Sequence, residues 1–139
     1  MRGYGTSESD PNAFGWGCTR DIDTGIARLQ TRSDAQSDRI GGLGLSVGGE
    51  QMIEAAAGGP ALRAVVAEGA GERSVKESLI RGPKGYFAAP MAAVRTAAVA
   101  VSSGQPVPPA LDELASRISP RALFLIHAQD GGGGEDLTP

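Results

Sequence analysis

Residues 21–68 alternate between helical and extended patterns, and this alternation constrains the fold more than any other feature of the sequence. Residues 21–32 have apolar side chains four and three positions apart, with acids in the first turn and arginines in the last, which predicts an amphipathic helix. An extended run at 39–45, a helix at 48–57 and a second extended run at 62–68 follow after short links. Short links in such an alternation favour right-handed crossovers. We therefore predict an α/β fold with a parallel sheet.

Residues 72–120 interrupt this alternation, because they contain no convincing strand. We predict helices near 75–80 and over 91–101, with Pro90 in the first turn of the second helix, where proline is well tolerated. Pro109 is predicted to open a further helix. A helical insertion that acts as a cap explains this segment best.

The two ends of the chain frame these segments. Residues 1–17 are predicted to be a loop, and Thr19 is predicted to cap the first helix. Residues 121–128 form a continuous apolar run, which is typical of a strand covered on both faces, and a glycine tail follows at 131–134. A length of 139 residues suits one domain, so we expect a single domain over 1–139.

The charge balance and the single cysteine narrow the classes of partner and compartment. Thirteen Lys and Arg against sixteen Asp and Glu give a net charge of −3 without long runs of like charge, so we expect neither a nucleic-acid nor an anionic-membrane partner. Residues 1–7 lack the apolar core of a signal peptide, and the most apolar window, 88–101, is short and contains Arg95, so we expect no membrane span. A single cysteine, Cys18, cannot form an internal disulfide, which fits a cytoplasmic protein. One histidine, one cysteine and dispersed acids match no metal-ligand spacing, and we expect no metal.

One short motif carries chemistry: Gly44-Leu45-Ser46-Val47-Gly48, a G-x-S-x-G match between a predicted strand and a predicted helix. Where a strand turns this sharply into a helix, the serine adopts strained backbone angles and its Oγ projects above the edge of the sheet. Gly44 and Gly48 would give the necessary clearance. The N–H of Val47 would point at an oxyanion that develops on a substrate. The alternative is a glycine-rich turn in which Ser46 merely caps the helix.

A second interpretation comes from the glycine spacing. Gly42-x-Gly44-x-x-x-Gly48 is similar to a variant dinucleotide-binding loop, and Glu68 ends the next predicted strand, where such proteins place an acid. A dinucleotide loop, however, follows an apolar strand, whereas residues 37–39 are polar. We keep a dinucleotide-binding module as the lesser alternative.

Three segments together resemble the α/β-hydrolases of the dienelactone hydrolase or Xaa-Pro dipeptidyl-peptidase-like (CocE/NonD) type. The sequence RGYGTS at 2–7 resembles the R-G-x-G-x-S loop after the fourth strand of that family, DRIG at 38–41 resembles its lead-in to the nucleophile, and residues 44–50 match the nucleophile elbow. The resemblance spans nearly all of the chain. It implies a partial α/β-hydrolase fold with a cap-like insertion at 72–120, and a serine hydrolase that cleaves ester or related acyl bonds of small molecules without a cofactor.

The same resemblance implies roles for individual residues. Ser46 is the nucleophile and the N–H of Val47 is an oxyanion donor, while a histidine takes the serine proton and an acid orients that histidine. The acid follows the next-to-last strand in this family. Glu135 and Asp136 are therefore implied first, since DLTP at 136–139 resembles the D-x-x-P after that strand. The remaining candidates are Asp130 and Glu68.

The resemblance also implies parts that these 139 residues do not include. The catalytic histidine of the family follows its last strand, and the second oxyanion donor comes from a loop that would precede Met1. The one histidine, His127, falls inside the third predicted strand at a structural position of the family. We expect weak or no activity from this chain alone. The alternative is a non-catalytic remnant or half of a split hydrolase that forms a homo-oligomer or pairs with a complementary chain, since a small sheet with unpaired edges is poorly stable by itself.

Overall fold

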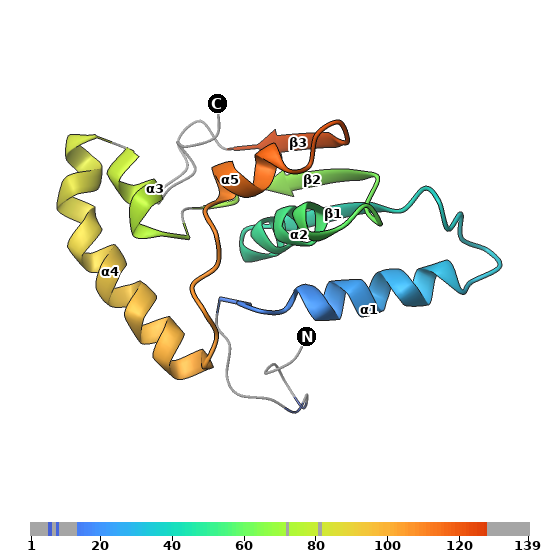
Figure 1. Ribbon diagram of the computed structural model, residues 1–139, viewed down its shortest axis with the longest axis horizontal. Coiled ribbons are helices and arrows are strands. Elements are labelled where there is room, and N and C mark those ends of the chain that lie inside the picture. The colour runs from blue at the N-terminus through green and yellow to red at the C-terminus, as the bar shows by residue number, and fades with distance from the viewer. Residues whose placement is uncertain (1–5, 7, 9–13, 72, 81, 128–139) are drawn as a thin grey trace.

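The computed structural model describes residues 6, 8, 14–71, 73–80 and 82–127. Its centre is a parallel sheet in the order β1-β2-β3, and α2 packs on β1 and β2 while α1 and α5 pack on α2 (Figure 1). The elements are α1 (Thr19–Gln30), β1 (Gly41–Leu45), α2 (Val47–Gly58), β2 (Ala64–Glu68), α3 (Val75–Ile80), α4 (Pro83–Ser103), α5 (Leu111–Ser116) and β3 (Ala122–Ile126). The α/β fold and the parallel sheet predicted from the sequence are confirmed.

The strands end in register. Leu45, Glu68 and Ile126 are aligned across the sheet, so the residues that follow them share its carboxyl edge. Two backbone hydrogen bonds extend this alignment by one residue: Ser46 N–H donates to the Glu68 carbonyl at 2.7 Å, and Gly69 N–H donates to the Ile126 carbonyl at 2.9 Å. In open parallel sheets, ligand-binding and catalytic sites lie at this carboxyl edge. In Figure 1, α3 and α4 lie beyond the same edge.

The hydrophobic core lies between α2 and one face of the sheet. Gly42 and Gly44 of β1 are buried, and a Cβ at Gly42 would lie 2.9 Å from Sδ of Met52 on α2. Without side chains at these positions, helix and strand approach closely. Ile53 of α2 is 2% exposed, and burial of such a side chain contributes about 1.5–3 kcal/mol. The core consists of Ile26, Ile40, Ile53, Ala56, Leu62, Val65, Ala67, Ala70, Leu114 and Ile118.

Two helix starts differ from the sequence predictions. The N-cap of α1 is Cys18, and Thr19 is already helical, so the predicted capping role of Thr19 is wrong. The start predicted at Pro90 is also wrong, because Pro90 lies inside α4. That helix begins seven residues earlier, at Pro83, and Gly82 before it has φ 68°. Pro83 is as good a helix start as Pro90, and the glycine before it allows the chain to change direction.

The third strand is less covered than its apolar sequence suggests. β3 lies at an edge of the described sheet, and Phe124 is 62% exposed. Its other face is better covered, since Leu123 and Leu125 pack against the core. The prediction that this strand is covered on both faces is therefore wrong for the described residues. Helices pack on only one face of the sheet there, and Leu43, Leu45, Phe124 and Ile126 are exposed on the other face.

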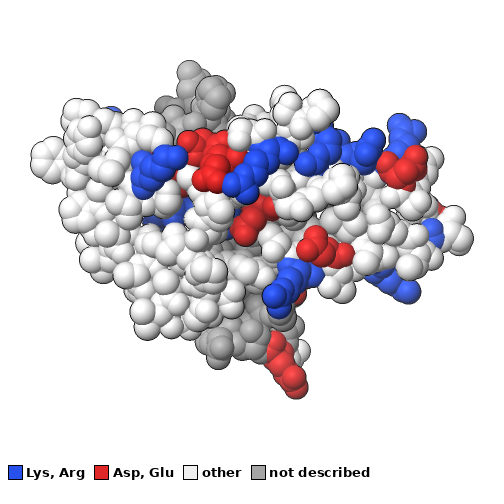
Figure 2. Space-filling view, in the orientation of Figure 1, with Lys and Arg blue, Asp and Glu red and all other residues white. Residues whose placement is uncertain are grey.

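Charge is distributed unevenly over the surface. Figure 2 shows a band of charged side chains along one side of the molecule and an almost uncharged area over α4. The only charged residues of α4 are Lys84 and Arg95, and its side chains Phe87, Met91 and Val101 are exposed. Among the described helices, none combines the length and the apolar character needed to cross a membrane.

Candidate active site

Ser46 lies at the sharp turn between β1 and α2. Its φ of 51° and ψ of −124° make it the one non-glycine residue with positive φ among the described residues. Such a conformation costs roughly 1–3 kcal/mol and persists only where its surroundings hold it. Here the N–H donates to Glu68 of β2, and the carbonyl accepts from Gly49 N–H at 2.9 Å and Glu50 N–H at 3.2 Å. The side chain is exposed at the carboxyl edge of the sheet.

Two glycines make this turn sterically possible. A Cβ at Gly44 would overlap the Gly48 carbonyl and lie 2.6 Å from the Gly49 nitrogen, all of it backbone. A Cβ at Gly49 would lie 3.1 Å from the Gly44 oxygen and 3.2 Å from the Ala67 Cβ. Nothing lies within 4 Å of a Cβ at Gly48, so the clearing role predicted for Gly48 is wrong. Gly49 takes that role, and the GG at 48–49 was the signal that could have found it.

The start of α2 bears on the two interpretations of Ser46. Ser46 is the N-cap residue, yet its side chain makes no helix-capping hydrogen bond among the described residues. Val47 is the first residue of α2, and the N–H groups of a first helical turn have no acceptor within the helix. The helix dipole adds positive potential at the same place. Among the described residues, the Ser46 hydroxyl therefore does not cap the helix, and Val47 N–H lies at the positive end of the α2 dipole.

Of the other predicted site residues, some lie among the described residues and some do not. Glu68 is the exposed last residue of β2 and pairs with Leu45, next to Ser46. His127 directly follows β3 rather than lying inside it, and it is exposed at the same edge. Two strand spacings of about 4.8 Å separate its backbone from that of Ser46. The acid candidates Asp130, Glu135 and Asp136 lie outside the described residues.

A buried cluster of charges, which the sequence interpretation missed, lies next to the turn at Ser46. The Arg73 side chain is 1% exposed, and it lies 3.2 Å (Nε) from Oε2 of Glu50 and 2.5 Å (Nη2) from Oε2 of Glu54. Burial raises the pKa of Glu50 to about 7, against the opposing charge of Arg73 and a hydrogen bond from the Gly71 backbone. Glu50 and Glu54 are one helical turn apart on α2, which is why one guanidinium reaches both.

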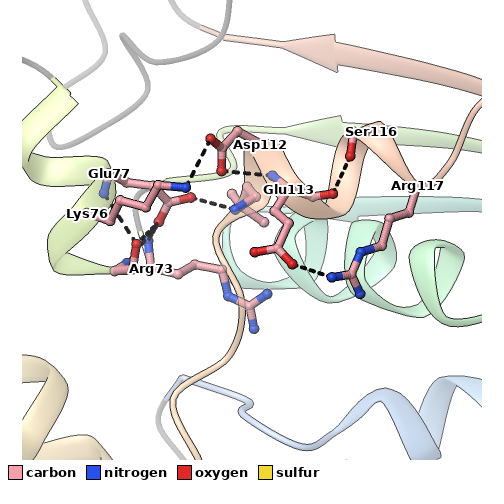
Figure 3. Close-up of polar contacts among 9 residues, drawn as sticks. Arg73, Lys76, Glu77, Asp112, Glu113, Ser116 and Arg117 are labelled. Atoms are coloured by element: carbon pink, nitrogen blue, oxygen red, sulfur yellow. Dashed lines mark hydrogen bonds and ion pairs between the residues drawn. The ribbon is translucent and has the colours of Figure 1, made fainter.

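A third carboxylate, Glu77, joins the helices beyond the sheet edge (Figure 3). Its Oε2 accepts from Arg73 N–H and from the N–H and hydroxyl of Ser74, and its Oε1 accepts from Leu111 N–H at 2.6 Å. Ser74 Oγ in turn accepts from Glu77 N–H, which completes a capping box at the start of α3. Glu77 thereby connects α3 to α5. The S-x-x-E pattern at 74–77 was a signal for this box.

Comparisons with known proteins show what this arrangement is similar to. No protein-family model matches the chain, and no curated protein matches it. Among solved structures, a glucuronoyl esterase from Solibacter usitatus is similar, with a TM-score of 0.58 and 16% sequence identity. The match covers 99% of this chain and 37% of that one, so this chain spans well under half of its structural neighbour. At this identity the likeness concerns the fold, and the chain has a partial α/β-hydrolase fold.

Proposed function

We propose that this chain carries the nucleophile of a serine hydrolase, with Ser46 attacking ester or related acyl bonds of small molecules. The observation that carries the proposal is the strained backbone of Ser46 between β1 and α2, with its side chain exposed at the carboxyl edge of the sheet. Strain of this kind persists where the surroundings impose it, and it is concentrated at functional sites. The esterase named in the structural comparison supports the same class of reaction.

The proposed chemistry is acyl transfer through a covalent intermediate. A general base takes the proton of the Ser46 hydroxyl while Oγ bonds to the acyl carbon. The carbonyl oxygen becomes an oxyanion, which accepts a hydrogen bond from Val47 N–H at the start of α2. The leaving alcohol departs with a proton from the base, and water then cleaves the acyl-enzyme. No metal or cofactor is required for these steps.

The base and the acid of this triad remain proposals. We assign the acid to Glu135 or Asp136, after β3, with Glu68 as the described alternative. His127 is the one histidine of the sequence and directly follows β3. We propose that the base comes from polypeptide outside these 139 residues, in the same chain or in a complementary one. The segment 72–120 is proposed as the cap-like insertion, and a dienelactone hydrolase or Xaa-Pro dipeptidyl-peptidase-like relationship belongs to the same proposal.

One observation favours the serine interpretation over a dinucleotide loop. Gly42 and Gly44 lie inside β1 and are buried against α2, whereas a dinucleotide loop places its glycines after the strand, facing a pyrophosphate. A non-catalytic pairing role finds support elsewhere, in the exposed apolar face of the sheet around Leu43 and Phe124. That role is compatible with the proposed hydrolase, because the complementary chain would supply the base.

Steady-state hydrolysis of 4-nitrophenyl acetate tests the proposal, using protein from the longest reading frame that contains these residues. Ser46→Ala should abolish activity above background, because the proposed acyl-enzyme forms on the Ser46 hydroxyl. Ser116→Ala is the matched control, since Ser116 is exposed on α5 and its hydroxyl donates to the Glu113 carbonyl of the same helix. Equal activity of Ser46→Ala and Ser116→Ala would contradict the proposal.

A further inference from the structure

Three charged side chains form a buried clamp next to Ser46, which we define as Glu50, Glu54 and Arg73. The guanidinium of Arg73 is almost completely buried and lies between the two carboxylates of α2. A guanidinium in such a place is stable only when opposite charges neutralise it. The clamp therefore fixes the segment that carries Arg73 to the first two turns of α2.

The clamp joins the two segments that hold the backbone of Ser46. Glu50 lies in the first turn of α2, and its N–H donates to the Ser46 carbonyl. Its carboxylate also accepts a hydrogen bond from the Gly71 backbone. Gly71 and Arg73 follow β2, whose last residue, Glu68, accepts the Ser46 N–H. Movement of either segment would thus displace Ser46 from one side.

The clamp also bears on the charge near the oxyanion position. A carboxylate in the first turn of α2 uses the same positive potential that would stabilise an oxyanion at Val47 N–H. Arg73, 3.2 Å from Glu50, offsets this negative charge. Without Arg73, the ionised form of Glu50 would lose the opposite charge that faces it within one helical turn of the nucleophile.

We infer that Glu50 and Arg73 are positioning residues, which hold Ser46 and Val47 N–H in the geometry for attack and balance the charge behind them. The inference rests on the proposed function of Ser46. Neither side chain touches the reacting atoms in this account. Both act through the backbone of the turn, so their loss should lower kcat and leave KM nearly unchanged.

The experiment measures kcat and KM for 4-nitrophenyl acetate in five variants, each corrected for its folded fraction by circular dichroism. Glu50→Gln alone is one of the five, because the double-variant comparison needs both single variants. Arg73→Met should lower kcat by about tenfold or more with KM within about twofold, because a small displacement of the nucleophile is costly. Arg73→Lys should recover part of the loss, since it restores the charge without the fork. Adding Glu50→Gln to Arg73→Met should lower kcat by less than the two single losses combined, because both side chains act on the same turn. Arg117→Met is the control, since the half-exposed Arg117 side chain pairs with Glu113 four residues before it, far in sequence from the clamp.

The outcomes separate this inference from the proposed function. If Arg73→Met lowers the melting temperature while kcat per folded molecule stays within about twofold, the clamp is structural only and the inference is overturned. Strictly additive losses in the double variant would show that Glu50 and Arg73 do not act together, and would overturn it too. If Ser46→Ala retains full activity, the proposed function fails first and the inference fails with it.

Discussion

The positive φ of Ser46 depends on residues that have no side chain. A Cβ at Gly44 would meet the backbone of Gly48 and Gly49, which cannot move without moving α2. Two hydrogen bonds then hold the turn from both sides. Ser46 N–H donates to the Glu68 carbonyl, and Gly49 N–H donates to the Ser46 carbonyl. The packing of β1 against α2 thus imposes the strain, which does not come from a conformational preference of serine.

Gly44→Ala and Gly48→Ala form a matched pair within the motif. The first should destabilise the fold by about 1–3 kcal/mol, because it overpacks backbone against backbone. The second should be neutral or stabilise by about 0.5–1 kcal/mol, since its Cβ meets nothing and alanine is the better helix former. Urea unfolding followed by the fluorescence of buried Trp16, the one tryptophan, measures both. Equal effects would show that the turn is not packed as described.

Glu50 should make stability depend on pH. Its pKa is raised to about 7 by burial, so the folded state holds the proton more tightly than the unfolded state, whose value is near 4.5. The resulting stabilisation is complete below about pH 4.5 and is lost as the pH rises through 7. Glu50→Gln cannot ionise, so it should gain stability relative to the wild type between pH 5 and 8, by up to about 3 kcal/mol. Urea midpoints of the two proteins at these pH values measure this, and parallel curves would contradict it.

At the scale of elements, one arginine fixes the end of α2. Arg121, directly before β3, donates to the carbonyls of Ala56, Gly59 and Leu62 at 2.7, 2.8 and 3.0 Å. These carbonyls lie at or beyond the carboxyl end of α2, where the helix leaves acceptors unsatisfied. The contact ties the start of β3 to the far end of the helix that begins at Ser46.

Removal of this contact should be costly. Arg121→Met should lower the free energy of unfolding by about 1.5–3 kcal/mol, the range for hydrogen bonds to charged groups. Arg63→Met is the comparison, because Arg63 stands directly before β2 as Arg121 stands before β3 and is exposed. It should change stability by less than about 0.5 kcal/mol. Thermal unfolding of the two variants measures this difference. Equal shifts in melting temperature would contradict the stabilising role of the Arg121 contact.

The sequence predicted the elements whose signals are local. The alternation over 21–68 and the helix at 75–80 depend on periodicity and breakers, and the structure contains them. The errors arose where several local signals compete or where burial depends on distant residues. Pro83 and Pro90 both suit the start of a helix. The apolar sequence at 121–128 does not show whether anything packs on the second face of the strand.

The residues of the candidate site also differ in whether local sequence signals could identify them. The G-x-S-x-G pattern pointed to the turn and to Ser46, because its chemistry is local. The clamp residue Arg73 could not be found from its neighbours in sequence, since its two partners lie on α2, beyond a strand and a loop. The roles proposed for Glu135 and Asp136 rest on family resemblance and stay predictions.

At the scale of the whole molecule, two apolar surfaces remain exposed in the described residues. One is the sheet face with Leu43, Leu45 and Phe124, and the other is the side of α4 with Phe87 and Met91. Figure 2 shows how little charge lies over α4. Contiguous exposed apolar surface of this kind favours association.

We expect the 139-residue chain to associate with itself through the sheet face. Its weight-average sedimentation coefficient should rise over about a hundredfold range of concentration, since association follows mass action. The double variant Leu43→Lys, Phe124→Lys should remain monomeric, because both side chains are exposed and charge there opposes contact. A wild-type chain that stays monomeric throughout and unfolds cooperatively would contradict this expectation.

The central claim, that Ser46 is an activated nucleophile, is tested most directly by covalent labelling. A fluorophosphonate probe is incubated with protein from the longest reading frame that contains these residues, and tryptic peptides are then mapped by mass. Cleavage after Arg39 and Arg63 gives the peptide 40–63, in which Ser46 is the only hydroxyl-bearing residue. We predict the adduct on this peptide, and its absence in Ser46→Ala. Labelling elsewhere with this peptide unmodified, or equal labelling of Ser46→Ala, would contradict the claim.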